Sequence, residues 1–148
     1  MTPDKDKLLC EKYPKIFKNR NSSVQESCMS WGLECEDGWF NLIDTLCSVI
    51  QNHVDWKTKN SPPEDVEDLQ PVADQVKSKF GGLRFYVSGG DDTISGMITM
   101  AESLSYKVCE ECGDAGTKKG RGWIFTMCDK CWESHPCNKV HEVNENNS

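Results

Sequence analysis

The 148-residue chain lacks any run of about twenty apolar residues, the length that an α-helix needs to cross a bilayer. Its first residues, MTPDK, do not resemble the start of a secretory signal peptide, which is basic and then apolar. We therefore expect a soluble, intracellular protein with no membrane partner.

Positive charge is also scarce. The sequence holds 17 Lys and Arg against 24 Asp and Glu, a formal net charge of −7. Such a surface repels nucleic acid unless basic residues cluster on one face. Residues 107–132 contain five basic and four acidic residues and therefore hold no basic patch. The charge favours a partner that has a basic surface.

Motifs of catalysis are missing as well. The chain has no nucleophile elbow, no phosphate-binding P-loop and no H-E-x-x-H sequence. His53 falls inside a predicted helix, where a packed histidine is commoner than a catalytic base. The sequence therefore predicts a protein that is not an enzyme.

Cysteine, in contrast, is abundant, and its spacing is informative. Four of the nine cysteines form two C-x2-C pairs with fifteen residues between them: Cys109, Cys112, Cys128 and Cys131. Both thiolates of such a pair reach one ion, and the second pair completes the tetrahedral shell that structural zinc prefers. A redox C-x-x-C motif would explain one pair but not the other. We predict one structural Zn²⁺ with no open coordination position.

Five cysteines remain outside this pattern: Cys10, Cys28, Cys35, Cys47 and Cys137. We expect them to be reduced thiols, most of them packed as small apolar groups. His135 and Cys137 lie close enough to the second pair to act as spare ligands. Four thiolates already close the shell, however, so we assign neither residue to the metal.

Hydrophobic spacing predicts the helices of the first half. Apolar residues recur at helical intervals from Trp39 to about Trp56 and indicate the main core helix. Residues 4–20 have apolar residues at roughly helical spacing, and Pro14 should end a first helix or start a second turn. The acidic stretch over residues 28–38 is typical of turns.

The second half mixes helix and strand. Pro71 is suited to the first turn of a short helix over residues 71–80. Residues 83–87 alternate apolar and polar and predict a strand. A further helix, capped by Asp92 or Thr93, would lead to the first cysteine pair.

We therefore predict an α+β fold: a small helical core with a short β-sheet, followed by a C-terminal four-cysteine module of the zinc-ribbon or treble-clef type. A helix after the second pair would favour the treble clef. The expected divisions are an α+β core domain over residues 1–107, the zinc-binding module over 108–135, and a flexible tail over 136–148.

Three residues are candidates for partner binding. Arg84 and Tyr86 should share the exposed face of the predicted strand, and Arg–Tyr pairs are typical of binding hot spots. Trp123, one of five tryptophans, lies between the two cysteine pairs and is a further candidate.

Several segments together resemble small zinc-ribbon proteins of tailed bacteriophages and prophages. They are WGLECEDGW (31–39), KFGGLRFY (79–86) and the knuckles CEECG (109–113) and CDKC (128–131). The resemblance covers about residues 28–132. It implies an accessory protein of the bacterial host cytoplasm, with no catalytic role carried over.

By analogy, such a protein would bind and inhibit a host protein, and the favoured target is a component of antiphage defence. Two other functions stay open. One is sequestration of a signalling nucleotide through Arg84, Tyr86 and the tryptophans. The other is binding of nucleic acid by the zinc ribbon, through Lys118, Lys119 and Arg121.

Overall fold

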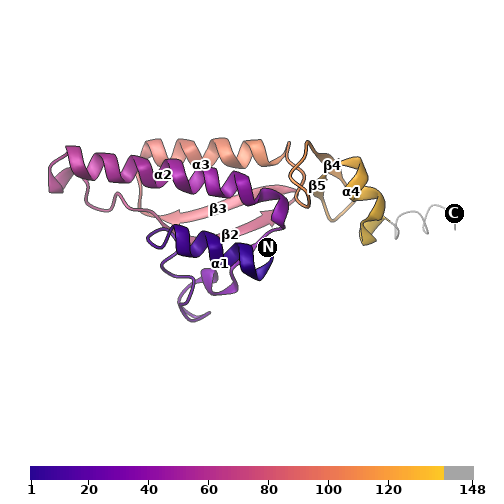
Figure 1. The fold of residues 1–148 in the computed structure, drawn as a ribbon, viewed down its shortest axis with the longest axis horizontal. Coiled ribbons are helices and arrows are strands. Elements are labelled where there is room, and N and C mark those ends of the chain that lie inside the picture. Colours follow the sequence, from indigo (N-terminus) through magenta and orange to yellow (C-terminus); the bar gives the residue numbers. More distant parts are fainter. Residues whose placement is uncertain (139–148) are drawn as a thin grey trace, which may run out of the picture.

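The computed structural model describes residues 1–138 and has an α+β fold, as the sequence predicts. The helices are α1 (Pro3–Lys12), α2 (Phe40–Asn60), α3 (Asp92–Ser105) and α4 (Asp129–Ser134). The strands are β1 (Leu33–Glu34), β2 (Val72–Lys79), β3 (Gly82–Ser88), β4 (Thr117–Lys119) and β5 (Phe125–Met127). Two sheets form: β1-β2-β3 in the larger part and β4-β5 near the C-terminal end, where Figure 1 shows a separate small lobe.

Helices α2 and α3 lie side by side and antiparallel along one face of the molecule (Figure 1). At one end, His53 and Lys57 of α2 both contact the carboxylate of Asp91, which precedes α3. At the other end, the indole N–H of Trp39 donates to the carbonyl of Val108, 2.9 Å away. Polar contacts therefore fix both ends of the helix pair.

The core lies between these helices, the α1 segment and the inner face of the sheet. The predicted main helix is confirmed, and it continues four residues further, to Asn60. Its buried residues are Ile43, Leu46, Cys47, Ile50 and Val54. Trp39, just before the helix, is fully buried, whereas Val49, an apolar residue within the helix, is 40% exposed.

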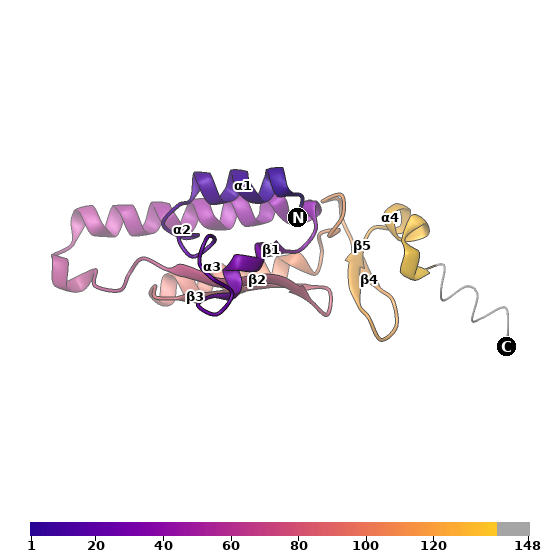
Figure 2. The same cartoon turned by 90° about the horizontal axis from the view of Figure 1, so that it is seen from below.

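The larger sheet has β2 at its centre, parallel to β1 and antiparallel to β3. Leu83 and Phe85 of β3 are buried, whereas Arg84 is half-buried and Tyr86 is exposed, so the predicted alternation is confirmed. Figure 2 shows β1, β2 and β3 from the side opposite α2. Side chains of α3 cover the outer edge of β3, because Ser105 and Glu102 accept its free backbone N–H groups.

The helix predicted over residues 71–80 is wrong, because these residues form strand β2. Ala73 and Val76 are both fully buried, and their three-residue spacing imitates a helix. A β-bulge between Ala73 and Gln75 inserts one extra residue, so both side chains point inward from one strand. The bulge depends on pairing with β3, which the local sequence does not reveal.

Two further expectations need correction. Residues 28–38 contain the short strand β1 besides their turns, since Leu33 and Glu34 pair with Val76 and Lys77. The residue that caps α3 is Asp91, not Asp92 or Thr93, because the Asp91 side chain accepts the backbone N–H of Ile94 at 2.9 Å.

The C-terminal lobe has the expected order: a cysteine knuckle, the β4–β5 hairpin, and a cysteine pair that opens α4. This order is that of a treble clef.

The core boundary expected at residue 107 stays a prediction. Most of the predicted tail, 136–148, lies outside the described residues. Residues 136–138 are described, and the backbone N–H of Asn138 donates to the carbonyl of His135. None of the helices within residues 1–138 combines the length and apolar character that a membrane crossing requires.

Asp91 should make stability depend on pH. Burial raises its pKa, but hydrogen bonds from His53, from the Ile94 N–H and from Lys57 outweigh this effect and lower the pKa to about 2. A lowered carboxyl pKa stabilises the fold above the unfolded value, near 3.8, and this contribution disappears as pH falls through about 2. Asp91→Asn should therefore reduce the free energy of unfolding at pH 7 by about 1 kcal/mol, since Asn still caps the helix.

Urea unfolding of both proteins at pH 7, 5 and 3 measures this difference, which should shrink between pH 5 and pH 3. Asp92→Asn is the matched control, because Asp92 is an exposed carboxylate in the first turn of the same helix. A difference for Asp91→Asn that stays constant across this pH range would contradict the assignment.

Candidate metal centre

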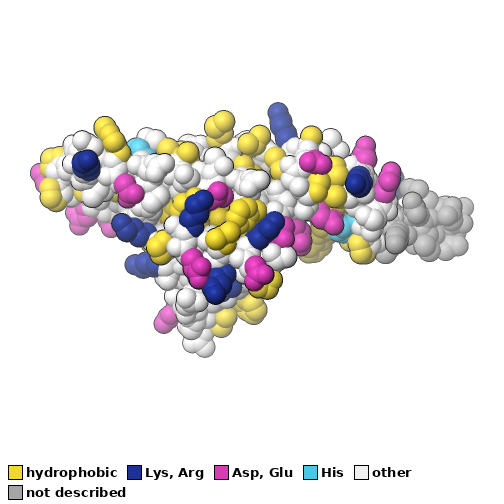
Figure 3. All heavy atoms as spheres, viewed as in Figure 1, with side chains coloured by type: hydrophobic (Ala, Val, Ile, Leu, Met, Phe, Trp, Pro, Cys, Tyr) yellow, Lys and Arg dark blue, Asp and Glu magenta, His cyan; other side chains and the backbone are white. Residues whose placement is uncertain are grey.

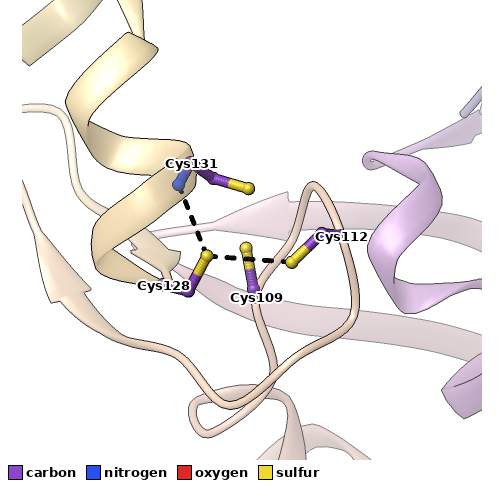
Figure 4. A group of neighbouring side chains, drawn as sticks. All are labelled: Cys109, Cys112, Cys128 and Cys131. Atoms are coloured by element: carbon purple, nitrogen blue, oxygen red, sulfur yellow. Dashed lines mark hydrogen bonds between the residues drawn. The ribbon is translucent and has the colours of Figure 1, made fainter.

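The four predicted ligands lie together in the C-terminal lobe. Cys109 and Cys112 belong to the loop after α3, Cys128 follows β5, and Cys131 lies in the first turn of α4. Their sulfur atoms all lie within 4.8 Å of one another and point toward a common centre (Figure 4). Within residues 1–138, this is the one group of cysteine, histidine or acidic side chains that could hold a metal ion.

The sulfur spacing distinguishes a metal site from a disulfide. The Sγ atoms of Cys112 and Cys128 are 3.7 Å apart. A tetrahedron with Zn–S bonds of about 2.3 Å has S–S edges of about 3.8 Å, whereas a disulfide bond measures about 2.05 Å. The four thiols therefore lie close enough together to share one ion, and the Cys112–Cys128 distance matches an edge of the zinc tetrahedron.

Backbone groups around the sulfurs favour thiolates. The N–H groups of Asp114 and Cys131 point at the sulfurs of Cys112 and Cys128, at 3.5 and 3.4 Å. Burial raises the pKa of Cys109, but backbone N–H hydrogen bonds outweigh this and lower the pKa to about 7. A thiolate is the form that binds metal, and the backbone favours it at Cys109, whereas burial and the neighbouring thiols raise the pKa of Cys131.

A buried carboxylate, Glu110, joins the lobe to the rest of the molecule. Its side chain accepts the hydroxyl of Ser78 from β2 at 2.6 Å and the backbone N–H of Thr126 from β5 at 2.7 Å. Its backbone N–H donates to the Thr126 carbonyl, and its carbonyl accepts the N–H of Gly38. Glu110 is 2% exposed, and burial raises its pKa.

Two more contacts cross the same junction. The hydroxyl of Thr126 donates to the carbonyl of Gly81 in the β2–β3 turn, at 2.6 Å. Gly38 lies so close to the knuckle that a Cβ there would come within 2.2 Å of the carbonyl oxygen of Cys109. The cysteine lobe is therefore fixed against the sheet by β2, by the β2–β3 turn and by the segment before α2.

The remaining cysteines are largely as expected. All nine are free thiols, and three of the other five are packed: Cys35 and Cys47 are buried in the core, and Cys10 packs against it. Burial raises the pKa of Cys35 to about 12. His135 does not join the metal group, because its ring stacks on Trp132, with ring centres 5.6 Å apart, and its Nδ1 accepts the backbone N–H of Cys137.

The three candidate partner-binding residues fall at two places. Arg84 and Tyr86 lie on the outer face of β3. The Arg84 guanidinium donates to the Tyr106 hydroxyl at 3.0 Å and lies 6.0 Å from the centre of that ring. Trp123 lies in the β4–β5 loop and is 75% exposed. The structure therefore does not bring Trp123 together with the Arg84–Tyr86 pair.

Trp123 instead lines a cleft between the sheet and the cysteine lobe, with a volume of 510 Å³. One wall holds Lys77, Lys79 and Phe80 from β2 and the turn that follows it. The opposite wall is the loop over residues 122–125, and the Ser78–Glu110 hydrogen bond lies at the base. The cleft therefore joins the two parts of the molecule that Glu110 connects.

Sequence reasoning missed Glu110 and this cleft. Glu110 reads as one of two ordinary acidic residues inside a knuckle, and only contacts with β2 and β5 reveal its role. The sequence predicts a helix for Lys77 and Phe80, whereas Lys77 lies in strand β2 and Phe80 in the turn that follows it. The one available signal was Phe80 itself, an aromatic residue directly before two glycines, where a turn favours small or polar residues.

Comparison of the chain with protein-family models, with curated proteins and with solved structures finds no match. The charged side chains of the surface are mixed in sign. On the face shown in Figure 3, basic and acidic side chains are interspersed and form no large region of one sign.

Removal of one thiol should abolish metal binding. We expect one zinc per chain in the purified protein and a nearly zinc-free Cys112→Ser variant, because three thiolates no longer close the shell. Loss of the ion should also destabilise residues 108–135 by more than about 2 kcal/mol. Elemental analysis and hydrogen exchange measure the two effects. Cys28→Ser, at an exposed thiol outside the group, should keep its zinc, and full zinc content in a Cys112→Ser/Cys128→Ser protein would refute the site.

The hydrogen bond at Glu110 should matter more than a similar bond on the surface. Ser78→Ala deprives a buried carboxylate of a donor and should cost about 1–3 kcal/mol of unfolding free energy. Ser88→Ala removes an exposed hydroxyl–carboxylate bond of the same 2.6 Å length, to Asp74, and should cost less than about 0.5 kcal/mol. Denaturant titrations compare the two variants, and equal costs would contradict a stabilising role for this junction.

Proposed function

We propose that this chain is a non-catalytic binding protein in which a structural Zn²⁺ holds the C-terminal lobe, and that it acts by binding and inhibiting a bacterial host protein. The observation that supports the proposal most is the closed set of four thiols. An ion with four sulfur ligands has no position for water or substrate, so its contribution is to stability.

Zinc fits the donor set better than other ions. Four thiolates in tetrahedral arrangement suit Zn²⁺ or iron, whereas hard cations such as Mg²⁺ and Ca²⁺ require oxygen ligands. The Cys112–Cys128 spacing of 3.7 Å agrees with the zinc geometry. The ion would hold the knuckle and the start of α4 together, and hence the loop that carries Trp123.

The exposed face of the large sheet is the surface that we propose for the host protein. Arg84 is already ordered by its hydrogen bond to Tyr106, so little side-chain entropy is lost on binding. Tyr86 and Tyr106 are both 43% exposed, and Tyr and Arg are the residues that dominate binding energies at protein interfaces. The net charge of −7 would steer the protein toward partners with a basic surface.

The alternative of nucleic-acid binding by the zinc ribbon receives less support. Of the three basic residues expected to carry it, Lys119 forms an ion pair with Asp129. That pairing reduces the positive charge which the hairpin presents to a phosphate backbone.

Affinity capture from bacterial lysate tests the proposal. The zinc-loaded protein should retain a specific host protein, and Arg84→Ala/Tyr86→Ala should lose it while keeping its zinc. Trp56→Ala is the matched control, because Trp56 is 64% exposed at the far end of α2 (Figure 1). Capture that the double variant leaves unchanged, or catalytic turnover by the purified protein, would contradict the proposal.

A further inference from the structure

The cleft between the sheet and the cysteine lobe has the features of a small-molecule site. Its volume of 510 Å³ lies within the range of about 300–1,000 Å³ that is typical of ligand pockets. It does not overlap the four thiols, and neither Arg84 nor Tyr86 lines it. A ligand bound there would therefore contact residues other than those proposed for the protein partner.

Two aromatic side chains line the cleft with most of their surface in solvent. Trp123 is 75% and Phe80 is 66% exposed, although burial of large aromatic rings is strongly favourable. Both therefore offer their rings to a flat, apolar group.

Phe80 also breaks a rule of turn formation. With Gly81 it forms the two-residue turn between β2 and β3, and both residues have positive φ angles, 55° and 78°. Such turns favour Asn or Asp before glycine, and a bulky side chain in this conformation is strained. Since the ring gains little burial in return, its placement points to a role in binding.

The charges of the cleft are of two kinds. Lys77 and Lys79 form no ion pair with any residue in the described part of the chain, and Lys79 Nζ lies 5.6 Å from the centre of the Phe80 ring. Three carboxylates line the same cleft: Glu34, Glu36 and the buried Glu110. A ligand that fits must be flat and apolar in one part, anionic in another, and able to donate hydrogen bonds.

We propose that the cleft binds a nucleoside 5′-phosphate. The base would lie against the rings of Phe80 and Trp123, and Lys77 and Lys79 would hold the phosphate. Glu34 or Glu36 would accept hydrogen bonds from an exocyclic amino group, which adenine, guanine and cytosine carry and uracil lacks.

Charge decides between a free nucleotide and a strand of nucleic acid. A strand would extend past the cleft over a protein of net charge −7, whereas a mononucleotide needs only the two local lysines. The cleft is also pre-formed, because the Glu110 hydrogen bonds fix the lobe against the sheet.

Isothermal titration of the zinc-loaded full-length chain tests this proposal. AMP should bind saturably, more tightly than adenosine, inorganic phosphate or UMP. Trp123→Ala should weaken AMP binding at least about tenfold, because stacking on the ring is lost. Lys77→Gln/Lys79→Gln should weaken AMP binding but leave adenosine binding unchanged. Trp56→Ala should bind AMP as the wild type does.

Phe80→Asn separates a binding role from a structural one. Asn is favoured in this turn, so the variant should have a higher melting temperature and yet bind AMP several-fold more weakly. A loss of both stability and binding would show that Phe80 serves the fold.

Three results would overturn the proposal. One is the absence of saturable binding of AMP, GMP and CMP up to about 1 mM, which corresponds to negligible affinity. The second is binding of phosphate as tight as that of AMP. The third is binding of a single-stranded oligonucleotide alone, with a steep salt dependence. Capture of a host protein depends on Arg84 and Tyr86, so either proposal can fail without the other.

Discussion

The buried carboxylate of Glu110 joins the cysteine lobe to the sheet. Its neighbour Cys109 belongs to the metal group, while its side chain accepts hydrogen bonds from β2 and β5. A carboxylate that is 2% exposed is costly unless its oxygens are satisfied, and here both oxygens have donors. The position of the cysteine lobe against the sheet therefore depends on these bonds, and the shape of the cleft depends on that position.

The four-cysteine group and the hydrogen bonds of Glu110 would stabilise the small lobe in different ways. The β4–β5 hairpin has three residues in each strand, and α4 has six residues, so neither could be stable alone. Four thiols that converge within 4.8 Å can hold a metal ion, which would be the internal cross-link. Glu110, Thr126 and Gly38 provide the external one. The lobe thus presents Trp123 from a short loop whose two ends are both held.

The surface features suit recognition at two adjoining places, since Lys77 of the cleft pairs with Arg84 across the sheet. The outer sheet face holds Arg84 against Tyr106, and the cleft holds Phe80 and Trp123 beside two lysines. Tyr106 also packs over Gly82, where a Cβ would come within 2.2 Å of its ring. Glycine at this position therefore allows the tyrosine to lie across the sheet and order the arginine.

Some of this could be predicted from local patterns, because the physical signal lies within a few residues. The two C-x2-C pairs identified the four thiols, the stripe after Trp39 identified α2, and alternation identified β3. The rest depends on partners distant in the sequence. The bulge of β2 exists only beside β3, Asp91 caps α3 where His53 and Lys57 also reach it, and the cleft is built from segments near residues 34–36, 77–80 and 122–125. Spacing along the chain thus determined which thiols meet. Tertiary packing alone decided that a carboxylate between two of those cysteines joins the lobe to the sheet, because a hydrogen bond between residues 32 positions apart leaves no mark on local spacing.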